Sequence, residues 1–236
     1  NLGVSFAVLN TLVKKNLLFK DKVAVDRFDF SNNHYDTTIN LTFDQNKAYS
    51  KLKDEILRKR VILFKGVTSS GKTEVYIELI KEVIQKKLNV LFLVPEIALT
   101  TQLVLRLKRY FPKNLHVYHS GINPNIRYEI WSDLIESKTP KVVLGARSSI
   151  FLPFKNLGLV VVDEENETSY KQFESSPLYN ARDLAVYLSK LYSAGCILAS
   201  ATPSIESFHN SVNKKYSYVE LNKRFGDFEL PELIFI

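Results

Sequence analysis

The chain has 236 residues, 45% of them apolar, and a formal net charge of +7 at pH 7 with an isoelectric point near 9.3. This apolar content is ample for a buried core, and no run approaches the roughly 18 uninterrupted apolar residues of a membrane helix, which argues against a membrane-spanning protein. Nothing at the start resembles a signal peptide, so we expect a cytoplasmic protein without a membrane partner. The positive charge is compatible with a polyanionic partner, but a solvated basic surface explains it equally well.

The chain contains one cysteine, Cys196, and no methionine. Cys196 lies in an apolar run, which predicts a small buried side chain and excludes a disulfide or a cysteine zinc site within this chain. Because methionine is absent even at position 1, we expect the chain to begin inside a longer protein.

The first 38 residues differ in pattern from the rest. Residues 5–18 have the apolar spacing of a helix, residues 19–30 alternate loosely as a short hairpin would, and residues 31–38 are polar and turn-rich like a linker. A helix and a hairpin are too little to enclose a core. We interpret residues 1–38 as a winged-helix-like remnant and linker; an N-terminal extension of the main domain is the alternative.

From residue 39 onward, apolar strands alternate with helical patterns, which is typical of an α/β fold with a parallel sheet covered by helices on both faces. The predicted strands are 61–65, 90–94, 115–118, 141–144, 159–162 and 197–199. The predicted helices are 72–87, 100–110, 125–137, 181–191 and 204–213. Trp131 shares a helix with Ile130 and Leu134, and we assign it to the core.

Residues 66–73 match the phosphate-binding pattern G-x-x-x-x-G-K-[ST] between an apolar strand and a helix. Gly66 and Gly71 allow the sharp turn and the close approach of backbone N–H groups to phosphate. Lys72 can reach the β- and γ-phosphates, and the Thr73 hydroxyl can ligate Mg²⁺. The predicted nucleotide-binding residues here are Gly66, Val67, Thr68, Ser69, Ser70, Gly71, Lys72, Thr73 and Glu74. The alternative is a glycine turn beside a surface lysine.

Asp163 and Glu164 end another apolar strand. A phosphate-loop ATPase needs one carboxylate for Mg²⁺ and another for the attacking water, and we assign Asp163 to the first role and Glu164 to the second. Lys72 and Glu164 are therefore the predicted catalytic residues. Since ligands gather at the carboxyl ends of parallel strands, we expect the function at that edge of the sheet.

Two segments resemble superfamily 2 helicases: Asp163-Glu-Glu-Asn166 resembles motif II, and Ser200-Ala-Thr-Pro-Ser204 resembles motif III. With the phosphate loop, six more segments extend the similarity over roughly residues 41–225, namely 93–100, 119–121, 145–148, 151–154, 169–172 and 179–185. Over this range the chain resembles the PriA family of replication-restart helicases.

That resemblance implies a RecA-like first helicase lobe at residues 39–222, with residues 223–236 leading toward a second lobe. It implies an ATP-dependent 3′-to-5′ DNA helicase that acts at stalled forks and in primosome assembly. ATP and Mg²⁺ are the implied cofactors, and zinc is expected only in a part of the full-length protein outside this chain. The implied partners are single-stranded and forked DNA, with single-stranded DNA-binding protein and primosome proteins as further candidates.

The resemblance also implies roles for individual residues. Gln45 would read the adenine of ATP, although on physical grounds alone it is an exposed residue at a helix start. The implied coupling residues are Asn166, Ser200 and Thr202. The implied residues along the single-stranded DNA path are Pro95, Thr100, Gln102, His119 and Arg147. For Arg147 a solvated surface charge stays open, and for His119 a structural hydrogen bond does.

An aromatic and basic cluster lies between motifs II and III, where the family has a loop that senses DNA. Its members are Tyr170, Lys171, Gln172, Phe173, Tyr179 and Arg182. Aromatic rings stack on bases with about 1–3 kcal/mol each, and such contact could be transmitted to nearby Glu164. The alternative is core packing, most plausible for Phe173.

Two positions depart from the family pattern. Ser69 stands where glycine is usual, a change that is tolerable if the local φ is negative. Asn166 stands where histidine is usual; it can hydrogen-bond but carries no proton. Because a helicase needs a second lobe, we expect this chain alone to bind nucleotide with little turnover. Another superfamily 2 translocase, a non-catalytic nucleotide- or DNA-binding scaffold and a small-molecule kinase stay open as other functions.

Overall fold

The computed structural model describes residues 38–174 and 176–224. The predicted winged-helix remnant and nearly all of residues 223–236 lie outside these ranges. Within the described part, no helix is long and apolar enough to cross a membrane.

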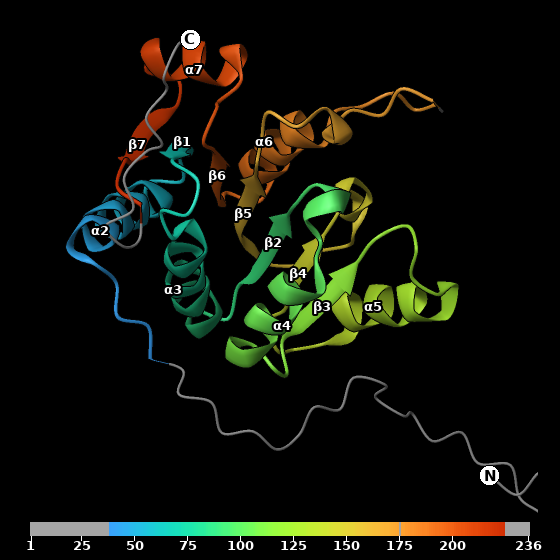
Figure 1. The fold of residues 1–236 in the computed structure, drawn as a ribbon. Helices are drawn as coiled ribbons and strands as arrows, with labels where there is room; N and C mark the ends of the chain where they lie inside the picture. Colours follow the sequence, from blue (N-terminus) through green and yellow to red (C-terminus); the bar gives the residue numbers. More distant parts are fainter. Residues whose placement is uncertain (1–37, 175, 225–236) are drawn as a thin grey trace, which may run out of the picture. The chain divides into compact units, whose positions relative to one another are not determined.

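Seven parallel strands form one sheet in the order β3-β4-β2-β5-β6-β1-β7 (Figure 1). The strands are β1 (Val61–Gly66), β2 (Asn89–Leu93), β3 (Leu115–Tyr118), β4 (Val142–Gly145), β5 (Leu157–Asp163), β6 (Gly195–Ser200) and β7 (Ser217–Leu221). All six predicted strands are confirmed with ends shifted by up to two residues, and β7 was missed. The parallel α/β fold is confirmed.

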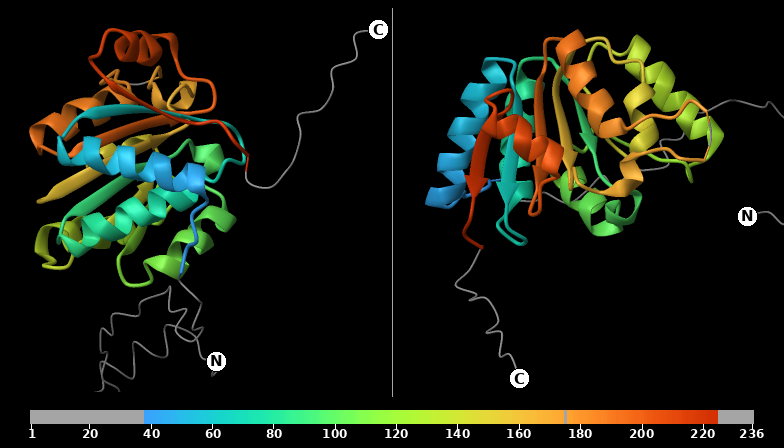
Figure 2. Two further views of the ribbon diagram at one scale, coloured as in Figure 1. Left: turned by 90° about the vertical axis from the view of Figure 1, so that its left-hand side faces the viewer. Right: turned by 90° about the horizontal axis from the view of Figure 1, so that it is seen from above.

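Helices cover both faces of the sheet (Figures 1 and 2). The α-helices are α2 (Phe43–Leu57), α3 (Lys72–Gln85), α4 (Thr101–Tyr110), α5 (Pro124–Glu136), α6 (Ala181–Leu191) and α7 (Ile205–Val212). The described residues also form three 3₁₀ turns that follow strands: η1 (Glu96–Ala98) after β2, η2 (Arg147–Phe151) after β4 and η3 (Thr168–Tyr170) after β5. The five predicted helices are confirmed, whereas α2 was not among them.

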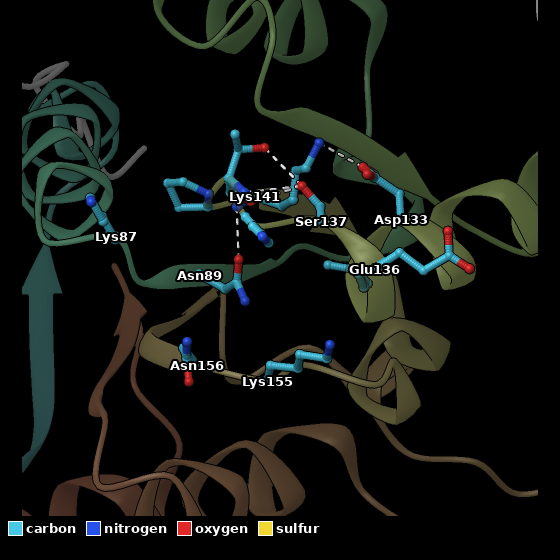
Figure 3. A pocket seen from close by; sticks show the side chains of 12 residues that line it. Lys87, Asn89, Asp133, Glu136, Ser137, Lys141, Lys155 and Asn156 are labelled. Carbon is cyan, nitrogen blue, oxygen red and sulfur yellow. Dashed lines mark hydrogen bonds and ion pairs between the residues drawn. The ribbon is translucent and has the colours of Figure 1, made fainter.

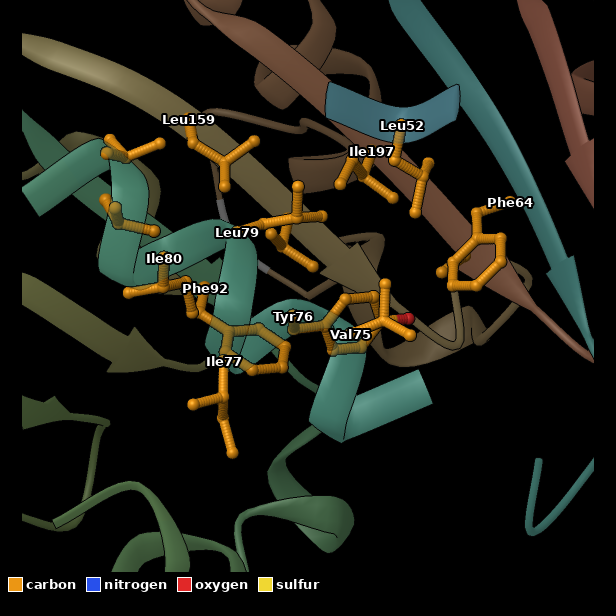
Figure 4. Packing of buried hydrophobic residues seen from close by; sticks show 14 of the residues in the cluster. Leu52, Phe64, Val75, Tyr76, Ile77, Leu79, Ile80, Phe92, Leu159 and Ile197 are labelled. Atoms are coloured by element: carbon orange, nitrogen blue, oxygen red, sulfur yellow. The ribbon is translucent and has the colours of Figure 1, made fainter. Parts of the chain in front are cut away.

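Two apolar layers hold the sheet. One contains residues of α2, α3 and α4, including Leu52, Tyr76 and Leu107, and part of it is drawn in Figure 4. The other contains residues of α5 and α6, including Ile130 and Ala185. The central strands β2 and β6 are buried along their whole length, which explains their continuous apolar sequence.

Two single-residue predictions for the core have opposite outcomes. Cys196 is fully buried, as predicted. The prediction for Trp131 is wrong, because its residue is 42% exposed. Ile130 and Leu134 turn the buried face of α5 inward, and an α-helix advances about 100° per residue, so Trp131 faces away from that side.

Caps define where the helices begin. Side chains of Thr42, Thr100, Asn123, Asn180 and Ser204 accept backbone hydrogen bonds at the starts of α2, α4, α5, α6 and α7. Among the described α-helices, α3 alone begins without a side-chain cap, at Gly71. Uncapped N–H groups at a helix start can bind an anion, so α3 begins as a phosphate-binding helix does.

Candidate nucleotide-binding and catalytic site

The backbone of the phosphate loop accounts for its two glycines. Gly71 has a φ of 82°, a left-handed conformation, and a Cβ there would collide with the side-chain amide of Gln45. A Cβ on Gly66 would lie 2.8 Å from side-chain carbons of Lys72. Both positions therefore need glycine, one for backbone conformation and space and the other for space alone.

Ser69 does not have the negative φ that would make it a simple replacement for glycine. Its φ is 61°, in the left-handed region. A side chain in this region costs roughly 1–2 kcal/mol, so the condition under which serine would be a tolerable replacement is not met.

Lys72 connects the loop to the predicted catalytic acid. Its Nζ donates to the carbonyl oxygen of Gly66 at 2.9 Å and lies 3.5 Å from Glu164 Oε1. The lysine side chain is 10% exposed, so this ion pair is partly shielded from water. The structure thus brings Lys72 and Glu164, which are far apart in sequence, into direct contact.

Asp163 lies beside Glu164 at the end of β5, and two phenols hold it. Tyr76 Oη donates to Asp163 Oδ1 at 3.0 Å, and Tyr170 Oη donates to the Asp163 carbonyl at 2.6 Å. Burial raises the pKa of Asp163 to about 6, with Lys72 opposing the shift and Glu164 adding to it.

The Asp163 carboxylate and the Thr73 hydroxyl fit a magnesium ion. Both are hard oxygen donors, and Mg²⁺ in such sites takes one or two protein ligands and completes its shell with water and phosphate oxygens. The described residues contain no group of three or more His, Cys, Asp or Glu that could hold a metal by themselves.

The three predicted coupling residues contact each other, and Ser200 also contacts Glu164. Ser200 Oγ lies 2.7 Å from Asn166 Oδ1 and 3.2 Å from Glu164 Oε2. Asn166 Nδ2 donates to Thr202 Oγ1 at 3.4 Å. An asparagine at this position can therefore connect motifs II and III through hydrogen bonds.

A hollow of about 520 Å³ lies at the phosphate loop. It is lined by Thr38, Ile39, Asn40, Gln45, Val67, Ser69, Ser70, Gly71, Lys72, Thr73, Glu74, Arg106 and Tyr110. The sequence analysis did not predict five of these lining residues, namely Thr38, Ile39, Asn40, Arg106 and Tyr110. Arg106 comes from the face of α4 turned to this hollow, and it forms an ion pair with Glu74. Nothing in the local sequence of α4 marked it.

Gln45 is not the exposed residue that physical grounds alone suggested. It is 2% exposed, and its Nε2 donates to the carbonyl of Ser70 at 3.0 Å. Its Oε1 accepts from the backbone N–H of Thr42 at 2.9 Å, which closes a capping box at α2. Gln45 thus connects the start of α2 to the phosphate loop.

The predicted DNA-path residues follow strands β2, β3 and β4 but differ in exposure. Gln102 is exposed, whereas Pro95 is buried, so a side-chain contact of Pro95 with DNA is excluded in this structure. Thr100 is exposed, and its hydroxyl accepts from the backbone N–H of Leu103 at the start of α4.

The other two predicted residues make hydrogen bonds within the protein. His119 Nδ1 accepts from the N–H of Gly121 at 3.2 Å, which is a structural hydrogen bond. Arg147 Nη1 donates to the carbonyl of Lys171 at 2.8 Å.

The aromatic and basic cluster divides into inward and outward residues. Tyr170 is 1% exposed and cannot stack on a base here, which corrects its assignment to DNA. Phe173 is 64% exposed, so the alternative of core packing, which was expected most for this residue, is wrong for it.

Three other members of the cluster make contacts nearby. Lys171 Nζ lies 4.9 Å from the Phe173 ring, and Tyr179 packs edge-on against Phe151. Gln172 Nε2 donates to the carbonyl of Pro177 at 3.3 Å.

Arg182 points inward to a buried acid, Glu165, that sequence reasoning missed. Arg182 Nη1 lies 3.3 Å from Glu165 Oε2, and the Glu165 side chain is fully buried. Glu165 also accepts hydrogen bonds from Ser204 N, Ser204 Oγ and Ser207 Oγ, at 2.6, 3.0 and 2.9 Å. The assignment of Arg182 to DNA is therefore replaced by a structural role between β5, α6 and α7. The sequence signal for a buried acceptor here was the pair of hydroxyl donors, Ser204 and Ser207, three residues apart at the start of α7.

A second hollow, of about 350 Å³, lies at the amino ends of β2, β4 and β5 (Figure 3). Lysines from several segments line it, namely Lys87, Lys138, Lys141 and Lys155. Lys141 Nζ is paired with Asp133 at 2.6 Å. None of the predicted site residues lines this hollow.

Comparisons with known proteins identify the family. Residues 44–210 match the family model described as "DEAD/DEAH box helicase". The chain is 37% identical over 233 residues to "Replication restart protein PriA" of Bacillus subtilis, covering 97% of this chain and 29% of that protein. It is 44% identical over 167 residues to the protein of the same name from Haemophilus influenzae, covering 71% of this chain and 23% of that protein.

Solved structures support the fold. A RecG structure bound to a three-way DNA junction matches with a TM-score of 0.57 and 23% identity, covering 80% of this chain and 25% of that one. The helicase MrfA bound to DNA matches with a TM-score of 0.55 and 19% identity, covering 78% and 27%. The RecA-like fold and the resemblance to PriA proteins are thereby confirmed, although the chain spans less than a third of the curated relatives that it matches. Since the helicase model covers more than half of the chain, the chain belongs to the DEAD/DEAH box helicase family.

Proposed function

We propose that this chain is the ATP-binding first lobe of a PriA-like, ATP-dependent 3′-to-5′ DNA helicase that acts in replication restart at stalled forks and in primosome assembly. The observation that carries the proposal is the contact of Lys72 and Ser200 with Glu164. This contact joins the phosphate loop, motif II and motif III. The 37% identity to a replication restart protein supports the biological setting.

The chain's own residues divide the work of hydrolysis. The uncapped N–H groups at the start of α3 bind the phosphates. When a nucleotide binds, Lys72 Nζ leaves the Gly66 carbonyl and Glu164 and donates to phosphate oxygens instead. Thr73 and Asp163 would hold Mg²⁺, and the ion would supply charge neutralisation at the phosphates. Glu164 then orients and deprotonates the attacking water, while Ser200 holds the Glu164 carboxylate.

The same proposal covers the adenine and the DNA. Gln45 lines the nucleotide hollow, and we propose that it would contact adenine. Single-stranded and forked DNA run past the carboxyl ends of β2 to β4 and the outward part of the cluster. The residues proposed to contact DNA are Thr100, Gln102, His119, Arg147, Lys171, Gln172, Phe173 and Tyr179. Zinc, protein partners such as single-stranded DNA-binding protein and primosome proteins, and the cytoplasmic setting belong to the full-length protein.

Nucleotide binding is tested with a fluorescent ATP analogue and Mg²⁺, using this chain and its Lys72→Ala variant. We expect the variant to lose binding, because Lys72 lies at the loop and lines the hollow. Lys65→Ala is the matched control: Lys65 lies on the preceding strand and pairs with Glu220 at 3.5 Å. Equal binding by all three proteins would refute the phosphate site.

The catalytic role is tested in the full-length protein with Glu164→Gln, which keeps the size of the side chain and removes its basicity. We expect ATP hydrolysis and fork unwinding to fall by at least about 100-fold, with nucleotide binding retained. Unwinding at the wild-type rate would instead favour a non-catalytic scaffold.

A further inference from the structure

Tyr76 links the helix of the phosphate loop to the acid assigned to magnesium. It lies four residues after Lys72 on α3, one helical turn further along. Its Oη donates to Asp163 Oδ1 at 3.0 Å, across the interface between α3 and β5. One helix therefore contributes both the phosphate lysine and a hydrogen bond to the carboxylate.

The packing around Tyr76 leaves its ring little freedom. The residue is fully buried, and its ring meets Phe64 and Phe92 edge-on, with centroids 6.1 and 5.4 Å apart. Tyr76 and Phe92 lie side by side in Figure 4. A hydroxyl in such an apolar layer needs a partner, because leaving it unpaired costs roughly 1–3 kcal/mol. Asp163 is that partner, so the position of the ring fixes the position of the hydroxyl.

Asp163 is thus fixed at two points. Tyr76 holds one carboxylate oxygen, and Tyr170 holds the backbone carbonyl at 2.6 Å. The hydrogen bond from Tyr76 occupies Oδ1 and limits rotation of the carboxylate about its last torsion. A carboxylate that is already oriented loses less conformational entropy when it joins the shell of an ion.

We propose that Tyr76 is a positioning residue for magnesium: its hydroxyl orients the Asp163 carboxylate so that the other oxygen serves the Mg²⁺ of the bound nucleotide. This inference rests on the proposed function, because it needs a magnesium nucleotide at the phosphate loop. Groups that orient metal ligands are worth about 10–100-fold in metal affinity in other proteins.

The test is Tyr76→Phe, which removes one oxygen and keeps the ring. Binding of a fluorescent ATP analogue to the chain is measured over a range of Mg²⁺ concentrations and also in EDTA. We expect the half-saturating Mg²⁺ concentration to rise about tenfold, with unchanged binding in EDTA. Tyr49→Phe is the matched control, because Tyr49 likewise donates to a carboxylate, Glu82 on α3, but Glu82 has no role in the proposed phosphate or magnesium site.

A double-mutant cycle separates positioning from packing. In an Asp163→Asn background, Tyr76→Phe should have no further effect on the Mg²⁺ dependence, because the carboxylate that it orients is gone. An unchanged Mg²⁺ midpoint in Tyr76→Phe, or equal losses with and without Mg²⁺, would overturn the inference. If the wild-type chain bound nucleotide with no Mg²⁺ dependence, the magnesium-nucleotide site of the proposed function would be refuted, whatever the effect of Tyr76→Phe.

Discussion

Ser69 occupies a left-handed backbone conformation, with a φ of 61°, in the loop that binds phosphate. Its neighbour Gly71 has a φ of 82° without a side chain to strain it. The strain at Ser69 follows from the collision of its Cβ with the backbone, and it persists because the loop is held by Gln45 and by the start of α3.

Replacing Ser69 by glycine should relieve this strain. We expect Ser69→Gly to raise the free energy of unfolding by up to about 1 kcal/mol, since the entropy cost of glycine offsets part of the gain. Urea unfolding of the chain measures it. Thr68→Gly is the matched control, because Thr68 is in the same loop and lacks a positive φ; it should lose about 0.5–1 kcal/mol. Equal effects of both variants would contradict the argument.

At the same scale, residue types alone could not show which side chains of an irregular segment point inward. Tyr170 and Phe173 lie in one polar stretch without helical or strand periodicity, and the more polar ring is the buried one. Tyr170 tolerates burial because its hydroxyl reaches the Asp163 carbonyl. Phe173 has no such constraint. The hydrogen bond that decides between them joins residues close in sequence, but it forms only because the segment folds back onto the end of β5.

At the scale of elements, burial on both faces made most strands predictable. The strand β2 is buried at all five positions, and its sequence is a continuous apolar run after Asn89. The missed strand β7 lies at the sheet edge and is buried only at Val219 and Leu221. The missed helix α2 buries only Gln45, Ala48 and Leu52 along its 15 residues. β7 and α2 therefore carry too little apolar pattern to be recognised.

The contact between α5 and the neighbouring strands includes a carboxylate with a testable pH dependence. Asp133 Oδ2 lies 2.6 Å from both His116 Nε2 and Lys141 Nζ. Burial alone would raise the pKa of Asp133, but the hydrogen bonds from Lys141 and His116 outweigh it and hold the pKa below its ordinary value. A carboxyl with a lowered folded pKa stabilises the fold above its unfolded pKa, and loses that effect as pH falls through the folded value.

We therefore expect Asp133→Asn to be less stable than the wild type by about 1–3 kcal/mol at neutral pH, and this difference to shrink below about pH 4. Unfolding by urea at a series of pH values measures it. Asp54→Asn, on the exposed side of α2, controls for the loss of one negative charge. A difference that stays constant from pH 7 to pH 3 would mean that the ion pair is not its source.

At the scale of the whole molecule, parallel strand order places the chemistry at one edge of the sheet. Asp163 ends β5, Ser200 ends β6, and the phosphate loop follows β1, all as neighbours in the sheet. This convergence was predictable, because it depends only on strands being parallel. The hydrogen bonds of Tyr76 and Glu165 were not, because they depend on how helices pack.

Basic charge is not confined to that edge. Lys87, Lys138 and Lys155 line the hollow at the amino ends of the strands, on the far side from the proposed DNA path. Lysines therefore lie at both edges, so the net charge of +7 does not by itself choose between a solvated basic surface and a polyanion site. The two can be separated by salt, because only a lysine that neutralises a phosphate contributes to counterion release on binding.

Binding of single-stranded DNA to the full-length protein, measured from low to high salt, should distinguish the two edges. Lys171 is exposed beside Phe173, and we expect Lys171→Ala to reduce the slope of log affinity against log salt by about 0.7. Lys155→Ala removes an exposed lysine at the far edge and should leave the slope unchanged. Equal reductions in both variants would mean that DNA is held by the general charge of the surface, and that the carboxyl edge does not define its path.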